Sequence, residues 1–102
     1  MESKTAKVHA VRRLVLDVDK AIKAPSLLEI AHAIQNCTGV DACNITVSEV
    51  DIETVGTNVT IEGSALDYDE IVRAIEHTGA VVHGLDQIAA GSRIIEDVPR
   101  SR

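Results

Sequence analysis

The chain has 102 residues, the size of a single domain, and 45% of them are hydrophobic, which is enough for one modest core. Its formal net charge of -6 argues against binding to a phosphate backbone by bulk charge. Tyr68 is the only aromatic residue, which argues against binding single-stranded nucleic acid through stacked bases. We therefore expect a protein with no nucleic-acid partner.

The chain carries no sign of export or of membrane insertion. Residues 1–7 are polar, with no apolar run behind a basic flank, and we expect them to be a disordered leader rather than a signal peptide. No stretch approaches the roughly 18 to 20 apolar residues that a membrane span needs. These features predict a cytoplasmic protein with no membrane partner, in which Cys37 and Cys43 are free thiols.

The first half of the chain predicts a strand, a helix and a second strand. Residues 8–18 are rich in valine and leucine and predict the first strand. The helix starts after Ser26, which can cap the free amides, with Glu29 three residues on as in a capping box. Gly39 suits the left-handed residue that ends a helix. Residues 40–50 then alternate between apolar and polar, as a strand does.

The second half of the chain repeats this pattern. Residues 57–63 alternate as a strand, and a hairpin turn over residues 51–56 joins them to the strand before. A second helix follows and is built like the first: Asp67 is its N-cap, Glu70 lies three residues on, and Gly79 ends it. This internal repeat predicts two equivalent halves.

A last strand over residues 80–90 completes the order βαββαβ, and residues 91–102 are predicted to be an extended tail. Two βαβ halves of this kind form the ferredoxin-like arrangement. Right-handed crossovers place both helices on one face of a four-stranded antiparallel sheet of order 4-1-3-2. The sequence thus predicts an α+β ferredoxin-like domain over residues 8–90.

The sheet face without helices must be polar or covered by a partner. On the first strand, Leu14, Leu16 and Val18 share one side and should face the helices. The opposite side carries Val11, Arg13, Val15 and Asp17. This partly apolar open face predicts self-association, and a monomer with a somewhat apolar surface is the alternative.

The sequence contains no recognisable catalytic set, and we expect no enzyme activity. The loop after the first strand, residues 19–24, lacks the cysteine pair of a heavy-metal chaperone. It also lacks the glycine with which a backbone wraps around a phosphate. Four histidines are scattered over different elements and are interpreted as structural or surface residues. They are His9, His32, His77 and His83.

One cluster has the chemistry of a metal site. The first and second strands end at the same edge of the predicted sheet, where acidic residues gather. The candidate metal ligands are Asp17, Asp19, Asp51 and Glu53, with Glu49 nearby. Carboxylates suit Ca²⁺, but the third strand separates the two acidic groups by roughly 10 Å. One ion would need a loop or a neighbouring subunit to complete its site, and a solvated acidic rim is the alternative.

Several runs carry a resemblance to a known family. They are RLVLDV at residues 13–18, GVDACNITV at 39–47, VTIEG at 59–63 and VHGLD at 82–86. In this combination the chain resembles the archaeal domain-of-unknown-function family 211 over about positions 8 to 96. The resemblance implies an archaeal cytoplasmic protein of ferredoxin-like fold with no assigned activity. It also implies a ring-forming homo-oligomer and an associated calcium ion.

We interpret the chain as a non-enzymatic homo-oligomeric module that binds a divalent cation or small ligand at subunit junctions. Calcium is the one cofactor that we consider. The alternative is a regulatory sensor of a small molecule such as an amino acid. Sensor domains of the same topology bind effectors at dimer interfaces near the first strand–helix loop, which spans residues 17–25 in this chain.

Overall fold

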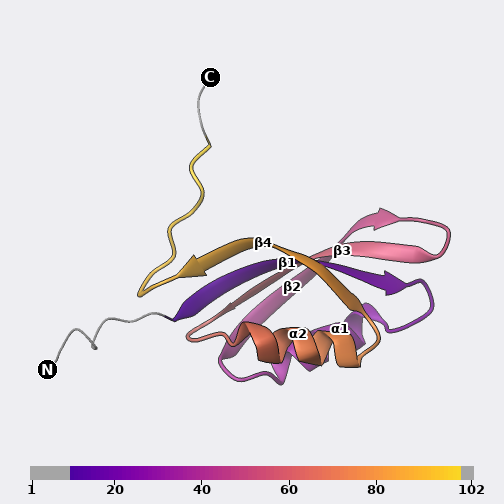
Figure 1. Cartoon of the computed structure of the whole chain (residues 1–102), viewed down its shortest axis with the longest axis horizontal. Helices are drawn as coiled ribbons and strands as arrows, with labels where there is room; N and C mark the ends of the chain where they lie inside the picture. The colour runs from indigo at the N-terminus through magenta and orange to yellow at the C-terminus, as the bar shows by residue number, and fades with distance from the viewer. Residues whose placement is uncertain (1–9, 100–102) are drawn as a thin grey trace, which may run out of the picture.

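Four antiparallel strands form one sheet, and two helices cover one of its faces (Figure 1). The computed structural model describes residues 10–99, so the predicted leader at residues 1–7 lies outside the described part. The elements are β1 (Val11–Ala21), α1 (Leu27–Gln35), β2 (Val40–Val50), β3 (Thr54–Gly63), α2 (Tyr68–His77) and β4 (Val81–Ala90). The strand order β2-β3-β1-β4 is the predicted order read from the other edge. The ferredoxin-like α+β fold is therefore confirmed.

Two strands extend further than predicted at the hairpin end of the sheet. β1 runs on to Ala21 rather than ending at residue 18, and β3 starts at Thr54 rather than at residue 57. The two extensions pair with each other, since Ala21 lies opposite Thr54. Lys20 is tolerated in the strand because its ammonium group donates to the carbonyl oxygens of residues 21 and 22, at 2.8 and 3.1 Å.

Both helices are capped as predicted, although the two caps differ. Ser26 and Glu29 form the full capping box: the hydroxyl accepts from the N–H of Glu29 at 3.1 Å, and the carboxylate accepts from the N–H of Ser26 at 2.8 Å. Asp67 accepts from the N–H of Glu70 at 3.2 Å. The Glu70 carboxylate, however, accepts the N–H of Thr38 at 3.2 Å. The second box is thus half made, and Glu70 instead joins the start of α2 to the end of α1.

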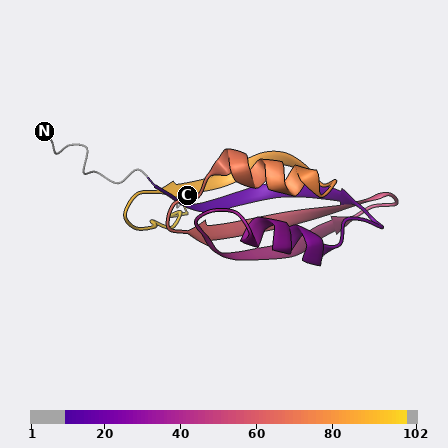
Figure 2. The same ribbon diagram turned by 90° about the horizontal axis from the view of Figure 1, so that it is seen from below.

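The core lies between the sheet and the two helices (Figure 2). Leu14, Leu16 and Val18 face the helices and are fully buried, as predicted. The helices contribute the isoleucines of their predicted apolar faces, which are Ile30, Ile34, Ile71 and Ile75. The glycines predicted to end the helices have positive φ angles, 79° at Gly39 and 105° at Gly79.

Exposed aliphatic side chains collect on the helix side of the two outer strands. The helices are about 15 Å long and the strands about 35 Å, so the strands project past the helices that cover them. The side chains left exposed there are Val47, Val50, Leu85 and Ile88. The open face is more polar than β1 alone suggests, because β2 and β3 line it with Asn44, Thr46, Asn58 and Thr60.

Residues 91–99 form neither helix nor strand and rise on the open side of the sheet (Figure 1). The guanidinium group of Arg13 donates to both carboxylate oxygens of Glu96, at 2.8 and 3.0 Å. Arg13 also donates to Glu62 of β3 at 2.7 Å, so one side chain ties the tail to the open face.

No helix within residues 10–99 is both long enough and apolar enough to cross a membrane.

Candidate functional site

An acidic hollow lies on the open face, where β1 and β2 end and β3 begins. Its volume is about 140 Å³. The residues that line it are Asp19, Glu49, Asp51, Thr54 and Gly56. Asp19 and Asp51 are two of the four predicted metal ligands, and Glu49 is the acidic neighbour expected beside them. The structure therefore brings part of the predicted cluster into one place.

Gly56 explains why carboxylates from strands on either side of β3 share one hollow. It lies opposite Asp19 in the β1–β3 ladder and opposite Glu49 in the β2–β3 ladder. A Cβ atom at this position would lie 3.4 Å from Asp19 Oδ1 and 3.7 Å from the Cβ of Glu49. The absent side chain leaves the space between the outer carboxylates open.

The other two predicted ligands, Asp17 and Glu53, do not line this hollow. Asp17 lies opposite Asn58, further back along β1. Glu53 is exposed in the hairpin turn, where its carbonyl oxygen accepts the N–H of Ile22 at 3.2 Å. The predicted set of four is thus divided between the hollow and its surroundings.

His83 lies beside the hollow, which the scattered positions of the histidines in the sequence do not reveal. Its Nε2 atom is 3.0 Å from Oδ2 of Asp19. An irregularity in the β1–β4 ladder, between Asp17 and Val18, shifts the register of β4 at this point. One oxygen of Asp19 therefore faces an imidazole, and the other faces the space above Gly56.

The hollow has suitable ligand atoms for a hard cation, but it is not a closed metal site. Ca²⁺ takes about six to eight oxygen ligands in flexible geometry. Three carboxylates and the hydroxyl group of Thr54 are available here. Within residues 10–99, however, no three His, Cys, Asp or Glu side chains stand ready to hold an ion together. A cation would need side-chain rotation or further ligands from a second copy.

A second hollow adjoins the acidic one at the end of β1. Its volume is about 230 Å³, and it shares Asp19 and Thr54 with the first. Its other lining residues are Lys20, Ala21, Gly79, Val81 and His83. The hollow thus borders the first strand–helix loop, where the sensor interpretation expects an effector. It combines an acidic, an imidazole and an aliphatic side chain.

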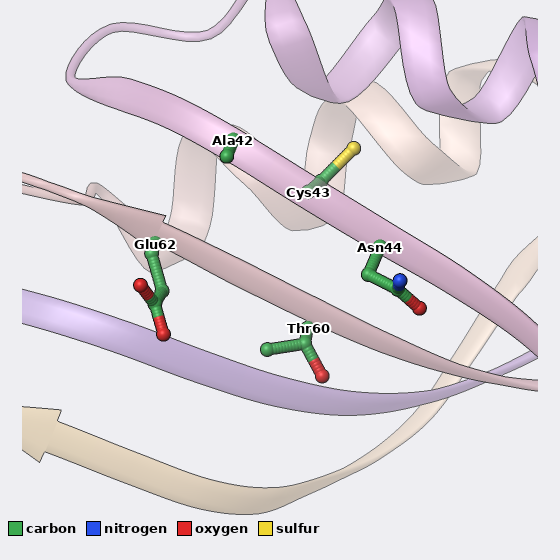
Figure 3. Close-up of a pocket in the computed structure, with 5 residues that line it drawn as sticks. All are labelled: Ala42, Cys43, Asn44, Thr60 and Glu62. Atoms are coloured by element: carbon green, nitrogen blue, oxygen red, sulfur yellow. The ribbon is translucent and has the colours of Figure 1, made fainter.

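A third hollow, of about 190 Å³, lies on the open face over β2 and β3 (Figure 3). Asn44, Thr60 and Glu62 project into the open side, whereas Cys43 points toward the helices.

Burial raises the pKa of the Cys43 thiol, and burial together with the charge of nearby Glu70 raises the pKa of the Cys37 thiol. Both free thiols are therefore poor nucleophiles at neutral pH.

Comparisons with known proteins agree with the resemblance seen in the sequence. Residues 12–102 match the model of domain-of-unknown-function family 211, described as uncharacterised ArCR. The uncharacterized protein MJ0319 of Methanocaldococcus jannaschii is 42% identical over 91 residues. These residues cover 89% of this chain and 93% of that protein. Neither description names an activity or a ligand.

Proposed function

The chain belongs to domain-of-unknown-function family 211, and we propose that it is a non-enzymatic, cytoplasmic module that assembles with copies of itself. In this proposal the subunit junctions hold a divalent cation or a small ligand. The free thiols agree with a reducing compartment.

The two outer strands support an assembling role. Natural proteins commonly guard exposed sheet edges with lysine, proline or inward-pointing charges. Neither β2 nor β4 contains a lysine, an arginine or a proline, although both carry acidic residues and pair with register shifts. Both strands expose aliphatic side chains, Val47 and Val50 on β2 and Leu85 and Ile88 on β4. These exposed aliphatic side chains on both outer strands are the observation that carries the proposal.

Sedimentation of the full chain tests the proposed assembly. We expect a mass well above the 10.9 kDa of one chain at micromolar concentration. Burial of the exposed edges provides the driving force, because aliphatic surface leaves water when they meet. A single species with the mass of one chain across the micromolar range would contradict the proposal.

The acidic hollow supports cation binding within such an assembly. Carboxylates of Asp19, Glu49 and Asp51 surround one small space, so their like charges repel. A divalent cation would relieve this repulsion. Because one copy offers too few ligands in position, a second copy at the junction would complete the site.

A regulatory sensor is the second candidate function, and the hollow at the end of β1 favours it. That hollow is about 230 Å³ and carries both Asp19 and His83. A thermal-shift screen of amino acids and nucleotides tests this function. An effector present at 100 times its dissociation constant should stabilise the fold by about 2.7 kcal/mol. A screen in which no compound shifts the melting temperature would remove this candidate.

A further inference from the structure

We infer that β4 of one copy pairs with β2 of the next, so that the sheet continues from copy to copy. This inference rests on the proposed homo-oligomer and names the surface through which it forms. β2 and β4 are the outer strands, and they run in opposite directions because every neighbouring pair is antiparallel. Two copies set side by side in the same orientation therefore present antiparallel edges to each other.

The strand registers define which residues of the two edges lie at the same level. Ile88 of β4 lies opposite Leu14 of β1, and Leu14 lies opposite Ile61 of β3. Ile61 in turn lies opposite Cys43 of β2. Traced in this way, the level pairs across an unstaggered junction are Leu85 with Ile45, Ile88 with Cys43, Gln87 with Asn44, Ala89 with Ala42 and Gly84 with Thr46.

Aliphatic side chains meet on the helix side of this junction. Leu85 and Ile88 are 41% and 54% exposed in a single copy. At the junction they lie beside Ile45 and Cys43 of the next copy, which are half-buried against its core. The pairing thus removes from water the aliphatic surface that the helices leave uncovered, in a cross-strand arrangement that stabilises sheets.

Small and polar side chains meet on the open side. Gln87 is level with Asn44, so the two amides can exchange hydrogen bonds. Ala89 is level with Ala42, so no bulky groups collide there. The junction therefore keeps apolar pairs on the helix side and polar pairs on the open side, as the strand pairs within the sheet do.

Within residues 10–99, the outer backbone edge of β4 has no hydrogen-bond partner over most of its length. At its start, the N–H of Val82 donates to the carboxylate of Glu76 at 3.1 Å. Residues 84–90 remain for pairing, which allows on the order of six backbone hydrogen bonds with β2. A typical protein–protein interface contains about ten direct hydrogen bonds. Strand pairing alone therefore supplies more than half of that number.

The tail and the hollow over β2 and β3 fit the same arrangement. A groove of about 470 Å³ separates the tail from β4, with Ile95 and Asp97 on one side and residues 86–89 on the other. The incoming β2 lies beside this groove and brings its hollow at Ala42 and Asn44 to the same open face (Figure 3). Ile95 is 72% exposed and lines this groove.

A single cysteine tests the register of the junction. Ile88→Cys places a thiol level with native Cys43 of the next copy. Paired residues in antiparallel strands have Cα atoms about 4.5 to 5.5 Å apart, which a disulfide can span. Mild oxidation of the full-length variant should give a ladder of covalent dimers, trimers and larger species on a non-reducing gel. Adding Cys43→Ser should abolish the ladder, and Leu28→Cys on the exposed side of α1 should give none.

Two complementary variants test that unlike edges meet. Leu85→Lys with Ile88→Lys closes the β4 edge, and Ala42→Lys with Asn44→Lys closes the β2 edge. The matched control, Leu28→Lys with Gln35→Lys, adds the same charge on the exposed side of α1. In analytical ultracentrifugation each edge variant alone should be monomeric, and their equimolar mixture should form heterodimers and nothing larger. The control should keep the wild-type mass, and circular dichroism verifies that each variant is folded.

Each outcome decides between the alternatives. A β4 variant that dimerises alone would show that β2 pairs with β2, and a β2 variant that dimerises alone would show that β4 pairs with β4. Either result overturns the inference and leaves the proposed homo-oligomer standing. The same conclusion follows if the mixture stays monomeric, or if the edge variants keep the wild-type mass. A monomeric wild type would overturn the proposed function itself. If a lysine pair unfolds the chain, the cysteine ladder decides: its absence from an oligomeric Ile88→Cys variant overturns the register.

Discussion

Arg13 joins four segments of the chain on the open face of the sheet. From β1 it donates to Glu62 of β3 at 2.7 Å and to Gln87 of β4 at 3.3 Å. Two further hydrogen bonds hold Glu96 of the tail. The hydrogen bonds that Arg13 donates to Glu96 and Glu62 raise the pKa of Arg13, and the hydrogen bond that Glu96 accepts from Arg13 lowers the pKa of Glu96. The placement of the tail around Glu96 therefore depends on a charged pair, whereas Arg12 holds the start of the tail by donating to the carbonyl oxygen of Ser92 at 3.0 Å.

We predict that acid detaches the tail. A carboxylate whose pKa is lower in the folded chain than in the unfolded chain stabilises the fold when the pH is above the pKa of the unfolded chain. That contribution is lost as the pH falls through the pKa of the folded chain. The ordinary value for Glu96 is 4.5, so its contact with Arg13 should be intact at neutral pH and weaken below 4.5. NMR chemical shifts of residues 91–99 should move in that acid range, whereas Arg13→Gln should show the detached shifts at every pH. Wild-type shifts that do not move on acidification would contradict the prediction.

The acidic hollow leads to a prediction about calcium. Millimolar Ca²⁺ should raise the melting temperature more than sodium chloride of matched ionic strength, which screens exposed charges over about 10 Å at 0.1 M. Asp19→Asn with Asp51→Asn should abolish the additional rise. Asp17→Asn with Glu53→Gln removes the same charge outside the hollow and should preserve it. If the two salts stabilise equally, the cluster is only a solvated edge.

At the scale of the elements, the internal repeat predicts equivalent losses of stability. Ile34 and Ile75 occupy matching positions on the two helices and are both fully buried. Replacing either with alanine should lower the free energy of unfolding by about 2 to 5 kcal/mol, as large-to-small changes in cores do. Leu28→Ala, on the exposed side of α1, is the control and should have little effect. Denaturant titration at one fixed protein concentration measures the difference.

The repeat also predicts one difference between its halves. Glu29 closes a capping box, whereas Glu70 accepts the N–H of Thr38. Glu70→Ala should therefore speed hydrogen exchange of the Thr38 amide, because that N–H loses its acceptor. Glu29→Ala changes the equivalent residue of the first helix and should leave this amide unchanged. Equal exchange of Thr38 in both variants would show that the bridge between the helices has no effect.

The elements that sequence analysis located correctly are those whose signals are local. The helix faces and the glycines that end the helices repeat within a few residues, so their positions follow from spacing alone. The additional residues at the end of β1 and the start of β3 could not be predicted in this way, because Ala21 and Thr54 adopt strand structure only by pairing with each other. The contact of Glu70 with Thr38 also depends on tertiary packing, because it joins the start of α2 to the end of α1.

The candidate site was predicted only in part because it depends on register. Asp19 and Asp51 were identified from strand ends, which chain order places at one edge. Gly56 opens the space between the strands only because it lies opposite Asp19 and Glu49. His83 reaches Asp19 through an irregularity in a different ladder. The usable signal for this hollow is a glycine in a middle strand, such as Gly56, that the predicted pairing places opposite an acidic residue in each neighbouring strand.

At the scale of the whole molecule, residues 10–99 form two layers, in which the helices cover one sheet face (Figure 1) and no described strand lies beyond β2 or β4. If copies assemble, folding and association are linked, and the melting temperature becomes dependent on concentration. We predict that it rises steadily as the protein concentration is increased from low to high micromolar. The variant with both Leu85→Lys and Ile88→Lys should melt at one temperature throughout. A wild-type melting temperature that is independent of concentration would argue against assembly.

The even number of strands has a consequence for any assembly built through these edges. Each added copy keeps its helices on the same side, so the assembly has one wall of helices and one wall of sheet, which also carries the tails. The acidic hollow at Asp19, Glu49 and Asp51 lies on the sheet wall and recurs once in every copy. A polycation with matching spacing would engage several hollows at once, and its avidity would exceed the affinity of any single hollow by orders of magnitude. One weak anionic site per chain would thereby become a strongly binding, regularly spaced surface.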